Sequence, residues 1–129
     1  MNWVALVVLL SLIEYVVFGS LVGRARGKYG IKAPAVTGHP LFERFFRVHQ
    51  NSLEQLILFI PAIWLFGLYV SALWAAIVGA AFLAARIVYA LGYVAAPERR
   101  EVGAWLTAAA EIILVIGALI GVILSIVRA

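Results

Sequence analysis

The chain of 129 residues contains no cysteine and only two histidines, His39 and His49. Without cysteine it can form neither a disulfide framework nor a thiolate metal site, and two histidines alone make a poor ligand set for zinc. We therefore expect no metal. Any thiol chemistry must use a thiol that the substrate brings.

Charged residues are also scarce. They make up 12% of the sequence, whereas 66% is hydrophobic and the mean hydropathy is +1.10. An ordinary soluble domain has about 25% charged residues, so this composition excludes a water-soluble globule. A bilayer crossing takes about 20 helical residues, which limits this chain to four spans. The net charge of +4 does not indicate a nucleic-acid partner, because the basic residues lie between apolar runs.

The apolar runs predict one all-α domain over residues 1–129, an integral membrane four-helix bundle with helices at about 3–23, 41–69, 72–94 and 102–127. The first run lacks the basic start and the small-residue cleavage site of a signal peptide, so we expect a retained helix. Residues 52–94 would make about 65 Å of helix, twice the bilayer thickness, and must fold back once. Residues 67–71 are the best place for that turn, because Trp64, Tyr69 and Trp74 then gather at one interface.

Basic residues mark one end of the predicted bundle. Eight of the ten Lys and Arg residues lie in the connection after residue 23, at the start of the second helix, or in the link at 96–101. The positive-inside rule places these segments in the cytoplasm and both termini outside, and we expect a bacterial inner membrane. Prolines and glycines between residues 30 and 40 indicate that the first connection is irregular.

Two pairs of glycines, Gly19/Gly23 and Gly117/Gly121, have the four-residue spacing that permits close helix contact. Such pairs are common in glycine-rich membrane helices. We interpret them as packing positions within or between subunits.

Three charged residues, Glu14, Arg86 and Glu111, lie inside apolar runs, each about nine residues from the basic end of its helix. They therefore share a depth of about 13 Å. Unpaired charges at membrane depth are costly, so we interpret Arg86 as a structural pin between the two carboxylates. The alternative is a proton-coupled site, as in small multidrug transporters, which also have four helices and an embedded glutamate in the first.

The second helix carries a polar stripe. At 100° per residue, Arg47, Asn51 and Glu54 fall within about 60° of one another, and Arg44 lies beside them. A guanidinium, an amide and a carboxylate on one face suit a zwitterionic peptide with free carboxylates and a free amine. The alternative is that Arg47 and Glu54 neutralise each other and hold the helix in the headgroup layer.

The third helix adds Arg86, Tyr89 and Tyr93 at spacings of three and four, which places both phenols on one face toward the basic end. The link beyond supplies Arg100, and Arg26 approaches from the first helix. We expect these separate segments to form one layer that attracts anions.

These residues resemble a known family. The motifs that carry the resemblance are Glu43-Arg44-x-x-Arg47-x-x-x-Asn51-x-x-Glu54 and Arg86-x-x-Tyr89-x-x-x-Tyr93. They are similar to those of the membrane-associated proteins in eicosanoid and glutathione metabolism (MAPEG), which include microsomal glutathione transferases, leukotriene C synthases and the five-lipoxygenase-activating protein. The resemblance covers nearly the whole chain.

The resemblance implies a homotrimer that binds glutathione between neighbouring subunits near the cytoplasmic face. The positions that match the family's glutathione contacts are Arg26, Arg47, His49, Asn51, Glu54, Tyr89 and Tyr93. Arg100 matches an arginine thought to stabilise the glutathione thiolate, which makes it the expected catalytic residue. A nearby guanidinium favours the thiolate, which is the nucleophile.

Three positions depart from the family pattern, and they bear on the second substrate. A tyrosine after Glu54 becomes Gln55, a glutamine contact becomes His49, and the second arginine of a pair beginning at Arg26 becomes Gly27. We expect a glutathione transferase that acts on a lipophilic electrophile or a lipid hydroperoxide dissolved in the membrane lipid. The alternatives are a non-catalytic lipid-binding scaffold of the same family and the transporter described above.

Overall fold

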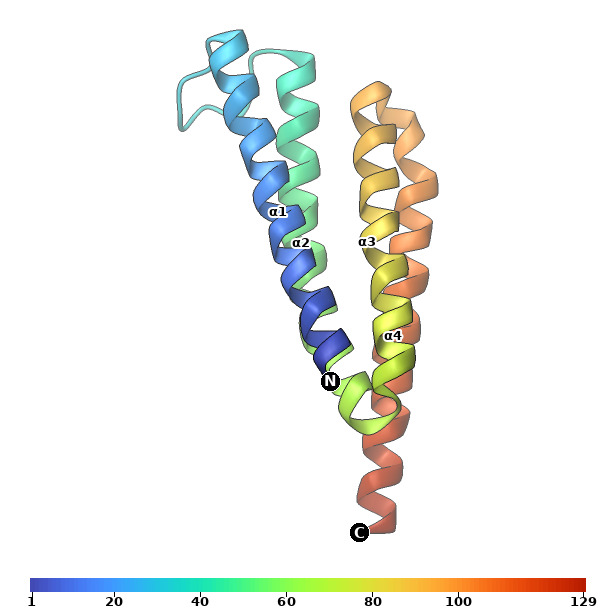
Figure 1. The fold of residues 1–129 in the computed structure, drawn as a ribbon. Coiled ribbons are helices and arrows are strands. Elements are labelled where there is room, and N and C mark those ends of the chain that lie inside the picture. The colour runs from blue at the N-terminus through green and yellow to red at the C-terminus, as the bar shows by residue number, and fades with distance from the viewer.

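The computed structural model describes all 129 residues and contains four α-helices, one short 3-10 helix and no strand (Figure 1). The elements are α1 Asn2–Tyr29, α2 Pro40–Tyr69, α3 Ala72–Ala95, η1 Pro97–Arg100 and α4 Glu101–Arg128. All four α-helices are long and apolar enough to cross a membrane. The predicted all-α membrane bundle is confirmed.

Helix α1 is longer than predicted. It continues six residues past residue 23 and ends where Gly30 adopts a left-handed conformation with φ 65°, its N–H bonded to the carbonyl of Arg26. Arg24, Arg26 and Lys28 therefore belong to the helix, whereas Lys32 lies in the irregular connection, which begins only at Gly30. Lys and Arg are good helix formers and favour the C-terminal end of the helix dipole, whereas glycine takes the left-handed conformation without strain.

The other helix ends agree with the sequence to within one residue. At the start of α2, Pro40 occupies the first turn, and Nδ1 of His39 accepts the backbone N–H of Leu41 at 3.2 Å. Helix α2 then runs through Pro61 as one helix. The predicted turn is confirmed, because only two residues join α2 to α3, and Oγ of Ser71 accepts the N–H of Trp74 at 3.2 Å.

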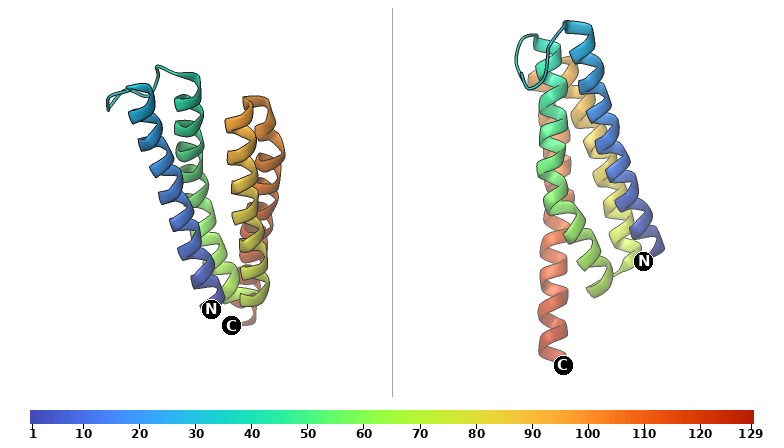
Figure 2. Two further views of the ribbon diagram at one scale, coloured as in Figure 1. Left: turned by 45° about the horizontal axis from the view of Figure 1, so that its top comes forward. Right: turned by 90° about the vertical axis from the view of Figure 1, so that its left-hand side faces the viewer.

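Both termini lie at the same end of the bundle as the α2–α3 connection (Figures 1 and 2). The opposite end holds the α1–α2 connection and η1, and we call it the basic end. The α1–α2 pair lies near the α3–α4 pair at the terminal end and diverges from it toward the basic end (Figure 1). Trp64, Tyr69 and Trp74 are all exposed near the terminal end, as a membrane-interface belt requires.

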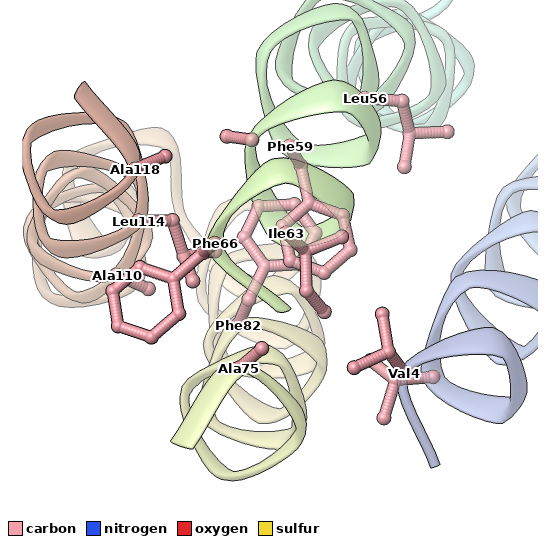
Figure 3. Close-up of a cluster of buried hydrophobic side chains, with 12 residues drawn as sticks. Val4, Leu56, Phe59, Ile63, Phe66, Ala75, Phe82, Ala110, Leu114 and Ala118 are labelled. Atoms are coloured by element: carbon pink, nitrogen blue, oxygen red, sulfur yellow. The ribbon is translucent and has the colours of Figure 1, made fainter. Parts of the chain in front are cut away.

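The apolar core lies between all four helices (Figure 3). The rings of Phe59 and Phe82 stack at 3.8 Å with an interplanar angle of 4°, and Val4 and Leu114 are fully buried beside them. In lipid, helix association depends on such packing rather than on removal of surface from water. Two smaller apolar clusters, around Phe18 and around Phe42, lie closer to the basic end.

The glycine pairs differ in their packing. A Cβ on Gly117 would collide with the ring of Phe66, and one on Gly121 would lie 2.8 Å from the carbonyl oxygen of Tyr69. This pair therefore packs α4 closely on α2 within the chain. In the other pair, Gly19 lies against the ring of His49, but nothing lies within 4 Å of a Cβ built on Gly23.

Candidate functional site

A cavity of about 390 Å³ opens toward the basic end between α2, α3 and the start of α4. Its lining comprises Arg47, Asn51, Gln55, Arg86, Tyr89, Tyr93, Arg100, Ala104, Thr107 and Ala108. Four of the seven expected glutathione contacts, Arg47, Asn51, Tyr89 and Tyr93, thus share one cleft with the expected catalytic residue Arg100. We call it the polar cavity.

Arg86 is buried at the base of the polar cavity, with only 2% of its surface exposed. Its Nη2 donates to Oδ1 of Asn51 at 2.8 Å and to Oγ of Ser52 at 2.9 Å, and its Nη1 donates to Oγ1 of Thr107 at 3.5 Å. The guanidinium also lies 4.3 Å from the ring centre of Tyr89. Three neutral oxygens and a π face thus surround the cation, while its Nε is buried without a hydrogen-bond partner.

Arg86 forms no direct ion pair with Glu14 or Glu111, and the expected pin between the two carboxylates stays a prediction. Both carboxylate oxygens of Glu111 lie 2.7–2.8 Å from the side-chain amide of Gln55, whose nitrogen donates to both once the amide is oriented to suit them. Glu14 is half-buried on α1. Sequence reasoning missed Ser52 and Thr107, and it did not predict the contact of Gln55 with Glu111, because neutral side chains carry no signal of their own inside an apolar run.

The bond from Arg86 also determines what Asn51 offers to a ligand. Its carbonyl oxygen is occupied by the guanidinium, so its Nδ2 is left as a donor toward the polar cavity. The site therefore presents N–H groups from Asn51, Arg47 and Arg100 together with two phenols. No carboxylate lines it, which makes the polar cavity a receptor for anions.

Two glycines bring Arg100 to this cavity. A Cβ on Gly92 would lie 2.5 Å from the carbonyl oxygen of Arg99, and one on Gly103 would collide with the backbone of Tyr89. The close approach of η1 and α4 to α3 sets the guanidinium of Arg100 5.7 Å from the ring centre of Tyr93. Sequence reasoning did not identify either glycine, although both flank the charged link.

Arg44, which the helical spacing placed beside the polar stripe, has a structural role. Its Nη1 donates to the carbonyl oxygens of Val94 at 3.1 Å and Ala95 at 3.4 Å. These are carbonyls of the last turn of α3, which have no partner within the helix. Arg44 thereby ties α2 to α3 at the basic end, where the two helix pairs diverge.

Three expected glutathione contacts lie outside the polar cavity. Arg26 donates to the carbonyl oxygen of Ala35 at 2.6 Å and so holds the α1–α2 connection. His49 stacks on Tyr15 of α1 at 4.3 Å, and Glu54 is exposed on α2. None of the three lines the polar cavity within the single chain.

The described residues contain no group of three or more His, Cys, Asp or Glu side chains that could hold a metal ion. The polar cavity itself is lined by cations, phenols and amides. Such a site can bind an acidic peptide and stabilise a developing or resident anion beside Arg100.

The model of the MAPEG family matches residues 4–120 of the chain. The protein belongs to the MAPEG family. It shares 42% identity over 118 residues with microsomal glutathione S-transferase 2 of Mus musculus. This alignment covers 92% of this chain and 80% of that protein. It shares 32% identity with leukotriene C4 synthase of Bos taurus over 92% of this chain and 79% of the relative.

A further relative is an uncharacterized protein of Synechocystis sp., which is 48% identical over 94% of this chain and 88% of its own length. The match to the family model, over residues 4–120, includes parts of all four helices and every residue that lines the polar cavity. The MAPEG protein described here is thus an integral membrane protein from a family of glutathione-related membrane enzymes.

Proposed function

We propose that this MAPEG protein is a membrane glutathione transferase that joins the thiolate of glutathione to lipophilic electrophiles. The observation that carries the proposal is the convergence of Arg47, Asn51, Tyr93 and Arg100 on one anion-binding cavity in a chain similar to glutathione S-transferases. Lipid hydroperoxides are a second class of acceptor: the thiolate takes the terminal oxygen as the O–O bond breaks, the lipid alkoxide takes up a proton, and a second glutathione condenses with the resulting sulfenic acid to give the disulfide and water.

The polar cavity supports this role through its donors. The carboxylates of glutathione pair with the guanidinium of Arg47 and accept from the amide of Asn51, while the phenol of Tyr93 orients the peptide. Arg100 then lies near the thiol and favours the thiolate, the form that attacks. A carbon–sulfur bond forms, and the electron pair passes to the leaving group or to the acceptor carbon framework, which takes up a proton.

The residues that the single chain leaves outside the cavity support a proposal about the assembly. We propose a homotrimer in which a neighbouring protomer supplies Arg26, His49 and Glu54 to glutathione bound between the two. Glutathione enters from the cytoplasm at the basic end of a protein in a bacterial inner membrane, by the positive-inside rule. The lipophilic acceptor arrives laterally from the bilayer.

Titration calorimetry with glutathione in detergent, together with rates of conjugation to a lipophilic aryl halide, tests the proposal. We expect heat of binding below millimolar ligand and a loss of about 10²-fold in rate for Arg100→Ala, the usual cost of removing one transition-state donor. Arg128→Ala, at the opposite end of the bundle, is the control. A loss of only two- to three-fold at Arg100 would contradict its role, and no binding heat at all would favour the non-catalytic scaffold.

A further inference from the structure

A second cavity, of about 400 Å³, lies on the other side of the α2–α3 seam from the polar cavity. Every residue that lines it is apolar, and α1, α2 and α3 all contribute: Phe18, Leu21, Phe45, Val48, Ile87, Ala90, Leu91, Val94 and Ala95. Leu91 and Ile87 are exposed at its edge. The glutathione chemistry uses none of these side chains.

A smaller cavity of about 260 Å³ continues this space toward the basic end. The two share Leu21, Phe45 and Val94, and the smaller one adds Arg24 and Lys28 of α1. Together they form one groove, which we call the α1–α3 groove. From Leu21 to Lys28 it follows α1 for about 10 Å at 1.5 Å per residue, from an apolar interior to a basic mouth.

The α1–α3 groove is separate from the polar cavity. A buried cluster of Phe18, Val48 and Tyr89 lies between them, with Tyr89 lining the polar cavity and Val48 lining the groove. An occupant of the groove therefore does not touch bound glutathione. The identity of the molecule that occupies the groove can therefore be tested without measuring glutathione conjugation.

The two cations at the mouth are not neutralised within the chain. Arg24 and Lys28 are exposed, and neither forms a hydrogen bond or an ion pair. Glu43, on the first turn of α2, instead accepts the backbone N–H of Gly38 at 3.4 Å. An unneutralised basic pair at the end of a span, directly above an apolar groove, has the charge pattern of a binding site for an anionic lipid.

We propose that the α1–α3 groove binds one anionic membrane lipid, with an acyl chain along Phe18, Leu21 and Leu91 and the head group between Arg24 and Lys28. The apolar part is within the usual size range of ligand pockets, about 300–1,000 Å³. The basic pair gives the groove its preference for a negatively charged head group. The apolar lining gives it affinity for the acyl chain of the lipid.

Native mass spectrometry of the full chain in detergent tests the head-group preference with phosphatidylglycerol and phosphatidylcholine of identical acyl chains. We expect the first phosphatidylglycerol to bind about tenfold more tightly, since each basic residue near an anionic head group contributes several-fold. Arg24→Gln with Lys28→Gln should abolish the preference, whereas Arg99→Gln, a basic residue outside the groove, should retain it. Equal affinity for the two lipids, or an equal loss in Arg99→Gln, would overturn the proposal.

Two further measurements test the apolar part of the groove. Ala90→Trp should weaken binding of both lipids, and millimolar glycerol phosphate should not compete because it has no acyl chain. Since the chain has no cysteine, Leu91→Cys introduces a single thiol, which a lipid-soluble maleimide should label in membranes and less so when phosphatidylglycerol is added. Absence of labelling, or disulfide-linked dimers through this thiol, would mean that a second copy covers the groove and would refute the proposal.

Discussion

The guanidinium of Arg86 donates to Oδ1 of Asn51 across 2.8 Å, which joins the most deeply buried cation of the chain to an amide that lines the polar cavity. The bond determines which end of the amide is free. Because the Oδ1 atom of Asn51 already accepts from Arg86, the Asn51 amide can only donate to a ligand. The polar cavity therefore gains a hydrogen-bond donor, Nδ2 of Asn51, next to Arg86.

Asn51→Asp separates this ligand role from a purely structural one. The aspartate still accepts from Arg86, so we expect the free energy of unfolding to be unchanged or raised. Glutathione affinity should fall at least tenfold, because a donor to a carboxylate contributes about 1.5–3 kcal/mol and the new oxygens repel the ligand. Calorimetry and unfolding in sodium dodecyl sulfate measure the two effects. Wild-type affinity in this variant would mean that Asn51 serves only Arg86.

Gly103→Ala tests the placement of Arg100. The new methyl collides with the backbone of Tyr89, so α4 must shift away from α3 and move Arg100 with it. A displacement of about 1 Å in a reacting group can cost about 10²-fold in rate. We expect a large loss of conjugation with the helix content intact by circular dichroism. Gly23→Ala is the matched control, because nothing lies within 4 Å of its new methyl, and its rate should equal that of the parent protein.

Phe82→Ala tests the core at the terminal end. The variant loses the stacked contact with Phe59 and leaves a void of roughly 100 Å³, which at about 24 cal/mol per Å³ costs about 2 kcal/mol. Reversible unfolding in mixed micelles measures this change in the free energy of unfolding. Ile113→Ala, at a position that is 51% exposed, should change it by less than about 0.5 kcal/mol. Equal losses in the two variants would contradict the assignment of the core.

Glu14→Gln distinguishes the transferase from a proton-coupled transporter. Glu14 lies on α1 and does not line the polar cavity, so we expect glutathione conjugation to stay within about threefold of the parent protein. A transporter that uses this carboxylate would lose export of lipophilic cations in the same variant. Measured export by the parent protein that disappears in Glu14→Gln, without any conjugation in either, would refute the transferase.

Much of the polar cavity was predictable from helical spacing. Arg47 and Asn51 share one face of α2, Tyr89 and Tyr93 share one face of α3, and these faces meet in the structure. His49 was expected at the site only from the family resemblance. Two residues from Arg47 amount to about 200° around the helix, so spacing places His49 on the opposite face of α2, where it packs on Tyr15 of α1.

The sequence by itself determined that the chain spans the membrane four times with its basic segments at one end. A membrane span requires only an apolar segment of sufficient length, and both the composition and the length of each segment can be read from the sequence. Only the tertiary structure decided that Arg86 bonds to neutral oxygens, and that Gly92 and Gly103 bring Arg100 over Tyr93. Those contacts depend on how closely the helices approach and how each is rotated. That geometry arises from the packing of all four helices together and from no single segment.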